Sequence, residues 1–124
     1  MKVDIKGVKV IDNIYVREGK TWSVLTLIEA SKDLEPFDLP LAGIDLGVNV
    51  WSEDTETVFG FAKHVKRVQE ADLKYPIILS DRGFIADGWH RVVKAIMLGR
   101  KTIKAVRLTE MPAPDSEEPT KESK

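Results

Sequence analysis

Residues 76–91 read PIILSDRGFIADGWHR, and this stretch decides the fold. Its beginning, Pro76–Ser80, is a nearly unbroken apolar run of the kind found in buried strands. Asp81–Gly83 has the composition of a hairpin turn, and Phe84–Ala86 can form the partner strand. The remaining residues start a helix near Gly88. The stretch therefore predicts a strand, a hairpin and a helix in direct succession.

The residues that follow complete a core motif over residues 74–108. The helix is expected to end at Gly99, because glycine readily adopts the left-handed conformation of a C-terminal cap. Thr102–Leu108 then reads as a closing strand.

An amphipathic helix is predicted before this motif, from Ser52 or Asp54 to about Asp72. Its apolar positions recur at steps of three and four residues, which is typical of a helix packed on a core. These positions are Val58, Phe61, Ala62, Val65, Val68 and Ala71. Glu53, Asp54 and Glu56 would lie in the first turn, where acids stabilise the helix dipole.

The N-terminal third is predicted to contain short strands and one helix. Loose alternation of apolar residues over the first twenty residues indicates one or two strands. From Thr21 the apolar steps favour a helix, capped by Thr21 or Ser23 and broken by Asp33–Pro36. Phe37–Leu41 reads as an edge strand, because Pro40 cannot donate to a ladder. Strands and helices mixed in this order predict an α+β domain with a small mixed sheet and packed helices.

The composition excludes several classes of protein. The chain has 124 residues, which suits one domain. Cysteine is absent, so disulfides, thiolate zinc sites and a cysteine nucleophile are excluded. No run approaches the ~18 apolar residues of a membrane span, and the acid in Met1–Asp4 does not suit a signal peptide. A cytoplasmic protein without membrane contact is expected.

Residues 111–124 are predicted to form a disordered acidic tail that follows a domain of residues 1–110. The tail contains three prolines and has no apolar periodicity. From Thr109 to Lys124, five acids and two bases give −3, so the rest of the chain carries +2 of the total of −1. This charge does not by itself indicate a nucleic-acid-binding protein.

The junction between the hairpin and the next helix has the features of an anion site. A strand that turns into a helix through Asp87 and Gly88 presents unpaired N–H groups and the positive end of the helix dipole. Gly88 has no Cβ to block an oxygen, and His90 and Arg91 add a tunable charge and a bidentate fork. Asp87 can cap the helix or, as a catalytic residue, hold a divalent cation or a hydroxyl proton through its carboxylate. The alternatives are an ordinary turn, surface side chains and a core role for Trp89.

With its proline-led apolar strand, its hairpin and the sequence Asp87-Gly88-Trp89-His90-Arg91, the chain resembles the ParB/sulfiredoxin superfamily. The likeness covers about Glu53 to Leu108 and is closest to a small stand-alone ParB-like domain of the branch with an Asp-Gly-x-His-Arg motif. It implies that Gly88, His90 and Arg91 contact nucleotide phosphates.

The resemblance also separates the branches of the superfamily. Asp87 matches the acid of the serine-kinase-like branch, whereas Trp89 stands where that branch has its first histidine. The sulfiredoxin branch needs a cysteine at the position of Trp89, so sulfinic-acid repair is excluded. Partition proteins carry a further DNA-binding domain, and an acidic tail follows here instead, so a full partition protein is not expected.

Further candidates lie on the helix that precedes the buried strand. His64 and Arg67 are three residues apart and share one face, which could form a second cationic wall for phosphates or an ordinary solvated face. Glu53 could serve as a catalytic acid, a base or a metal ligand, or could only stabilise the helix dipole. Trp51 could belong to the core or stack on a base. Glu35 and Asp38 flank the first strand of the motif, where the kinase-like branch has a catalytic glutamate.

A metal site made by protein ligands alone is not expected. The two histidines lie 26 positions apart and there is no cysteine, which matches no known metal-ligand spacing. Mg²⁺ bound together with the phosphates of ATP, ADP or CTP is the expected cofactor.

Three functions follow as hypotheses. The leading one is a nucleotide-binding enzyme, either a nucleoside triphosphate or diphosphate phosphohydrolase such as an ATPase or a small-molecule kinase. The second is a non-catalytic ParB-like regulatory module of plasmid or phage type, with a DNA or protein partner. A nuclease is least supported, because it needs clustered acids around metal and a basic track. The oligomeric state is not predicted.

Overall fold

The computed structural model describes residues 14–48, 50–51 and 55–118. In these ranges the chain has a mixed α+β structure with three α-helices and two sheets, which confirms the predicted fold class. It forms two compact units. Among the described residues, the first unit contains 14–35, 78–87 and 106–118, and the second contains 36–48, 50–51, 55–77 and 88–105.

The first unit begins with a β-hairpin and a helix. β1 (Ile14–Arg17) pairs antiparallel with β2 (Lys20–Ser23), and positive φ angles at Glu18 and Gly19 give the tight turn between them. α2 (Val24–Ser31) starts where the Ser23 side chain accepts a hydrogen bond from the Thr26 N–H. The predicted strands and the Ser23 cap are confirmed for this part. A helix start at Thr21 is wrong, because Thr21 and Trp22 belong to β2.

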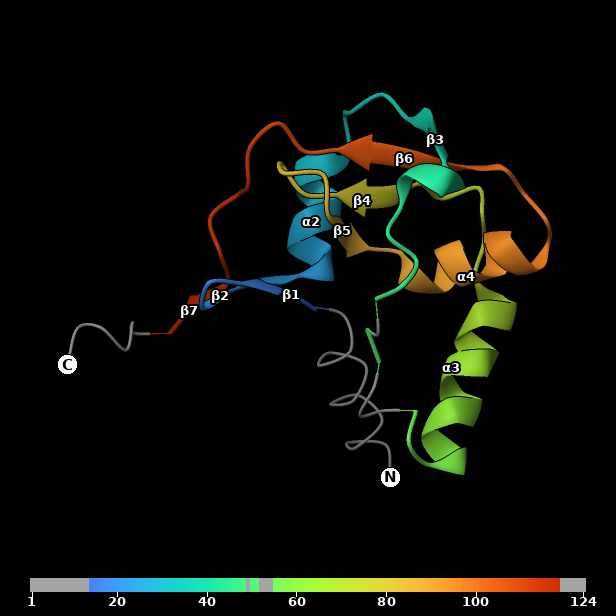
Figure 1. Cartoon of the computed structure of the whole chain (residues 1–124). Helices are drawn as coiled ribbons and strands as arrows, with labels where there is room; N and C mark the ends of the chain where they lie inside the picture. Colours follow the sequence, from blue (N-terminus) through green and yellow to red (C-terminus); the bar gives the residue numbers. More distant parts are fainter. Residues whose placement is uncertain (1–13, 49, 52–54, 119–124) are drawn as a thin grey trace. The chain divides into compact units, whose positions relative to one another are not determined.

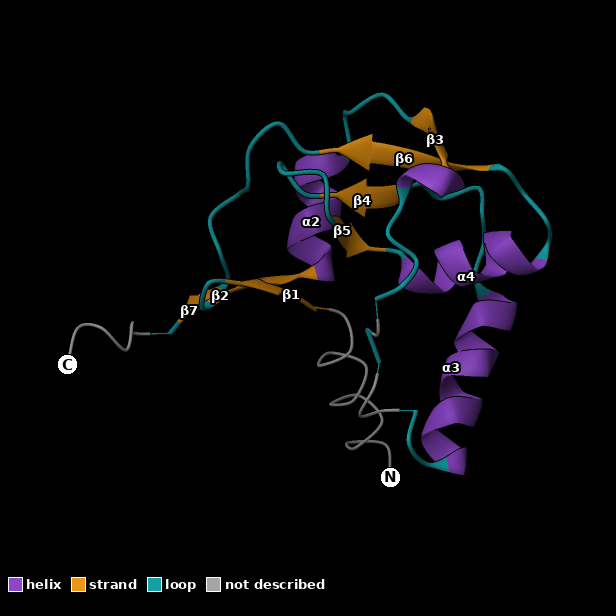
Figure 2. Ribbon diagram, viewed as in Figure 1, coloured by secondary structure: helices purple, strands orange, loops and turns teal. Residues whose placement is uncertain are grey.

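The predicted hairpin follows in the same unit. β4 (Ile77–Leu79) pairs antiparallel with β5 (Ile85–Asp87). α2 lies against β5 (Figure 2). The Ser80 N–H donates to the Phe84 carbonyl at 2.7 Å, and the strand begins one residue later than predicted, at Ile85. The buried core of this unit contains side chains from β2, α2, β4 and the segment 106–108: Trp22, Leu27, Ile78, Val106 and Leu108.

The segment from residue 111 to residue 118 is held against the first unit, which differs from the disorder expected of it. The Trp22 indole N–H donates to the Pro112 carbonyl at 2.7 Å. The Asp115 carboxylate accepts hydrogen bonds from the Ser23 N–H at 2.7 Å and from the Thr26 hydroxyl at 2.9 Å. β7 (Ser116–Glu117) then pairs with β2, which gives the strand order β1-β2-β7. These polar partners stabilise a segment that has few apolar side chains.

The carboxylates of the first unit make its stability depend on pH. Hydrogen bonds from the Ser23 N–H and then from Thr26 lower the pKa of Asp115 below its ordinary 3.8, and the Arg17 guanidinium lowers the pKa of Asp81. The unfolded chain therefore binds protons more readily than the folded chain. We expect this stabilisation to be complete above about pH 4 and to be lost as the pH falls through the lowered values.

Urea unfolding between pH 6 and pH 2 measures this effect. In Asp115→Asn, the free energy of unfolding should fall less between pH 6 and pH 2 than in the wild type. Asp33→Asn removes the same charge from an exposed position and is the control for net charge. A profile for Asp115→Asn that coincides with the wild-type profile would contradict the assignment.

The second unit contains one strand pair and two helices. β3 (Phe37–Pro40) pairs antiparallel with β6 (Thr102–Arg107) in the register Phe37↔Ala105 to Pro40↔Thr102. Residues 102–105 of β6 belong to this unit and residues 106–107 to the first. A short 3₁₀ turn, η1 (Leu41–Gly43), follows β3. Both predicted strands are confirmed.

α3 (Val58–Glu70) starts later than predicted. The Thr57 side chain accepts a hydrogen bond from the Gly60 N–H at 2.9 Å and caps the helix. Glu56 therefore precedes the helix, and its placement in the first turn is wrong. Glu53 and Asp54 lie outside the described residues.

α4 (Trp89–Met97) packs beside the C-terminal end of α3 (Figure 1). The Lys94 ammonium donates to the carbonyls of Gln69 and Ala71 at 2.8 and 2.6 Å, so it satisfies acceptors that the end of α3 leaves open. Gly99, with φ of 74°, follows α4 as predicted. Within the described ranges, no helix combines the length and the apolar character that a bilayer span requires.

The apolar stripe of α3 is mostly exposed. Val68 is buried, whereas Val58, Phe61 and Val65 are 88%, 58% and 38% exposed. Only one edge of the stripe faces α4, and His64 occupies a buried position there. The described part of the second unit therefore leaves an apolar helix face in contact with solvent.

Candidate functional site

The start of α4 requires a glycine. Gly88 caps the helix with φ of 121° and ψ of 15°, a backbone conformation that side chains strongly disfavour. A Cβ at this position would lie 2.5 Å from Ile77 Cγ2 and 2.7 Å from Ile77 Cβ. Ile77 is fully buried, so it has little room to move away. Gly88 is therefore required by its close packing against Ile77.

The two histidines of the chain meet beside this helix start. His64 comes from α3 and His90 from the first turn of α4, and their Nδ1 and Nε2 atoms lie 2.8 Å apart. The rings are nearly parallel, with an interplanar angle of 14° and centroids 5.0 Å apart. Because a hydrogen bond needs one donor and one acceptor, one of the two contacting nitrogens carries the proton and the other does not.

Trp51 completes this cluster. Its ring stacks on His64 and on His90, with centroid distances of 4.6 and 4.4 Å. Trp51, for which the sequence allows a core role or base stacking, lies half-buried against the histidine pair. We refer to Trp51, His64 and His90 as the histidine cluster. His64 is 6% exposed, so its imidazole is almost entirely enclosed.

The other candidate residues lie at separate places. Arg91 follows His90 in the first turn of α4 and donates to the Tyr75 carbonyl at 3.4 Å. Arg67 lies one turn after His64 on α3 and is half-buried. Asp87 ends β5 in the first unit, and Trp89 is the first residue of α4. Their predicted roles in binding phosphate or in catalysis stay predictions.

The acidic candidates give no site of their own. Asp38, on β3, forms an exposed ion pair with Lys104 at 2.8 Å, and Glu35 is an exposed residue before that strand. Glu53 lies outside the described residues. In the described ranges no three His, Asp or Glu side chains are grouped as metal ligands would be. Mg²⁺ bound with a nucleotide stays a prediction.

A partial signal for the cluster exists in the sequence. His64 and Val68 are four residues apart and lie on the same buried side of α3. A histidine in register with a buried valine indicates a side chain that faces a neighbouring element. Nothing in the spacing shows that this element carries His90 or that Trp51 covers both rings.

Comparison with protein-family models, with curated proteins and with solved structures finds no match for this chain. The chemistry of the site is therefore judged from its own residues.

Proposed function

We propose that the chain is a ParB/sulfiredoxin-like nucleotide-binding protein that hydrolyses or transfers a phosphate of a nucleoside triphosphate or diphosphate. The observation that carries the proposal is the 2.8 Å contact between His64 and His90 in the first turn of α4. A buried histidine that fixes a second histidine at a helix start is an arrangement suited to proton transfer beside a bound anion.

The helix start supplies the binding groups in this proposal. The first N–H groups of α4 lack intrahelical partners and lie at the positive end of its dipole, which favours phosphate oxygens. Those oxygens would be surrounded by four residues of the helix start: Gly88, Trp89, His90 and Arg91. His64 and Arg67 on α3 would add further positive charge beside the phosphate. Arg91 would stabilise charge on the transferred group.

The histidine pair would supply the proton transfer. His90 Nε2 lies 2.8 Å from His64 Nδ1. In the tautomer in which Nε2 carries the proton and donates to His64, the His90 imidazole would act as the base toward an attacking water or hydroxyl. His64 is then a positioning residue, and Asp87 would hold the nucleotide's Mg²⁺ or a second proton.

The exposed face of α3 favours a second candidate, a non-catalytic binding or regulatory module. Val58, Phe61 and Val65 form a contiguous apolar strip on one helix. Such strips on soluble proteins often mark interaction sites. A module of this kind would bind nucleotide without turnover, or would bind none.

A thermal-shift panel with ATP, ADP, CTP and GTP, each with and without Mg²⁺, tests the proposal. A ligand at about 100 times its dissociation constant adds about 2.7 kcal/mol, which corresponds to several degrees for a domain of this size. We expect a shift that is lost in His90→Ala and Arg91→Ala. Arg100→Ala, which removes the same charge from an exposed position after α4, should keep it.

A phosphate-release assay then separates the two candidates. Release that disappears in His90→Ala indicates the enzyme, and a shift without release indicates the binding module. The absence of a shift with every nucleotide would refute nucleotide binding.

A further inference from the structure

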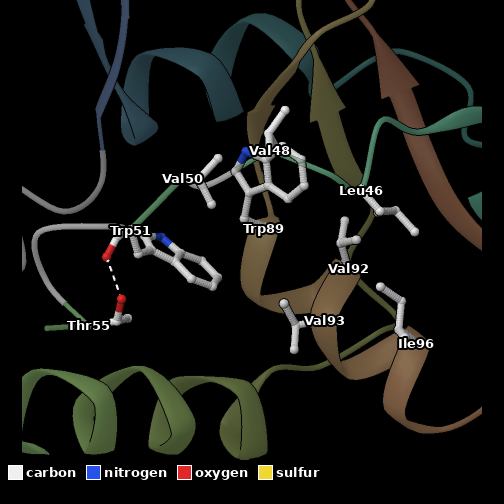
Figure 3. A pocket seen from close by; sticks show the side chains of 9 residues that line it. All are labelled: Leu46, Val48, Val50, Trp51, Thr55, Trp89, Val92, Val93 and Ile96. Carbon is white, nitrogen blue, oxygen red and sulfur yellow. Dashed lines mark hydrogen bonds between the residues drawn. The ribbon is translucent and has the colours of Figure 1, made fainter.

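A small apolar pocket lies within the second unit, between the segment that leads to Trp51 and α4 (Figure 3). Its volume is about 180 Å³. Trp51 and Trp89 contribute to its walls, and aliphatic side chains from both segments, among them Leu46, Val93 and Ile96, provide most of the remainder. None of the lining residues that the structure describes carries a charge.

The pocket offers few groups that could bind a polar ligand. Of the described lining residues, only Thr55 has a hydroxyl, and that hydroxyl already donates to the Trp51 carbonyl at 2.9 Å. The other side chains are aliphatic apart from the two indole rings. A molecule with several polar edges would give up hydrogen bonds to water here without replacing them. The lining therefore selects an uncharged apolar group.

The volume of the pocket limits the size of the ligand that it can bind. An apolar cavity of about 150 Å³ is large enough to bind benzene, and pockets for drug-sized ligands begin at about 300 Å³. A volume of about 180 Å³ suits one ring or two fused rings. Leu46 and Ile96 are about half exposed, so a ring placed between them would remove apolar surface from water.

The two tryptophans favour an aromatic ring over an aliphatic chain. Aromatic pairs prefer offset-stacked or edge-to-face arrangements, which the indole rings of the lining can offer to a bound ring. The Trp51 ring is held by its stack on His64 and His90, so this wall is formed before any ligand arrives. From the lining, the volume and the fixed indole we propose that the pocket is a binding site for a small uncharged aromatic molecule. Trp89 is shared with the proposed phosphate site, but binding of an aromatic ring here does not require that a phosphate binds there.

The three tryptophans allow a direct test with indole as the probe. The indole N–H signals of Trp22, Trp51 and Trp89 can be followed by NMR in one titration of the ¹⁵N-labelled full chain. Trp22 is buried in the first unit and donates to Pro112, so its signal is the internal control. We expect saturable shifts of the Trp51 and Trp89 signals, with a dissociation constant in the millimolar range of so small a ligand.

Variants that fill the pocket make the test specific. Val93→Phe should weaken indole binding about tenfold or more, equivalent to about 1.4 kcal/mol, while the Trp22 signal stays in place. If Val93→Phe does not fold, Ile96→Phe at the rim gives the same comparison. Val65→Phe adds the same side chain on α3 outside the pocket and should leave binding unchanged.

Three results would overturn the proposal: no movement of the Trp51 and Trp89 signals up to the solubility limit of indole, equal affinity in the filled variants, or adenosine binding as tightly as indole. The nucleotide panel uses a different ligand and different variants. A failure of either proposal can thus be recognised separately.

Discussion

Gly88→Ala is expected to lower the free energy of unfolding by about 4 kcal/mol and the Tm by about 15 °C. Two causes add together. A side chain at φ of 121° costs about 1–3 kcal/mol in backbone strain. The new Cβ would also overlap Ile77, with contacts of 2.5 and 2.7 Å, and overpacking of this kind costs about 1–3 kcal/mol. Urea unfolding followed by far-UV circular dichroism measures the loss.

Two other glycines separate these causes. Gly99 has φ of 74° and nothing within 4 Å of a built Cβ, so Gly99→Ala should show the strain alone, about 1 kcal/mol. Gly43 has no positive φ and also nothing within 4 Å, so Gly43→Ala should be neutral or slightly stabilising. Equal losses at Gly88 and Gly99 would show that the contact with Ile77 contributes nothing.

His64→Ala is expected to cost about 3 kcal/mol, the second largest effect. The substitution removes a hydrogen bond to His90, worth about 1 kcal/mol, and the ring stack on Trp51, worth about 0.5–1.5 kcal/mol. It also opens a cavity at a position that is 6% exposed. If His64 positions His90 for catalysis, phosphate release should fall together with stability. Chemical unfolding and the phosphate-release assay measure the two effects.

A double-mutant cycle isolates the contact between the two histidines. His64→Ala, His90→Ala and the double variant should give a coupling energy of about 1–2 kcal/mol. Val65→Ala, at the next and more exposed position of α3, is the control and should cost much less. A coupling energy near zero would mean that the 2.8 Å contact does not contribute to stability.

The fold was predictable from sequence where several local signals agreed. Residues 76–108 combine an apolar run, a turn tripeptide and a glycine at each end of a helix, and the structure contains the expected elements there. The start of α3 was not predictable in this way, because acidic residues at 53–56 and Thr57 offered rival starts. Thr57 forms the cap, since its hydroxyl reaches the Gly60 N–H.

Long-range contacts explain what local patterns missed. The segment from residue 111 has the composition of a disordered tail, but Pro112 and Asp115 bind groups of β2 and α2 about ninety positions earlier. In the same way, the histidine cluster joins residues from three separate segments. The motif at Asp87–Arg91 pointed to His90, but the sequence could not show which side chains enclose it.

Because of the exposed face of α3, the free energy of unfolding can depend on the concentration of molecules that bind this face. Any molecule that covers Val58, Phe61 and Val65 in the folded chain, and does not bind the unfolded chain, shifts the folding equilibrium toward the native state. At ten times its dissociation constant such a molecule adds about 1.4 kcal/mol. The midpoint of unfolding would then rise with the concentration of whatever covers the face, including the protein itself.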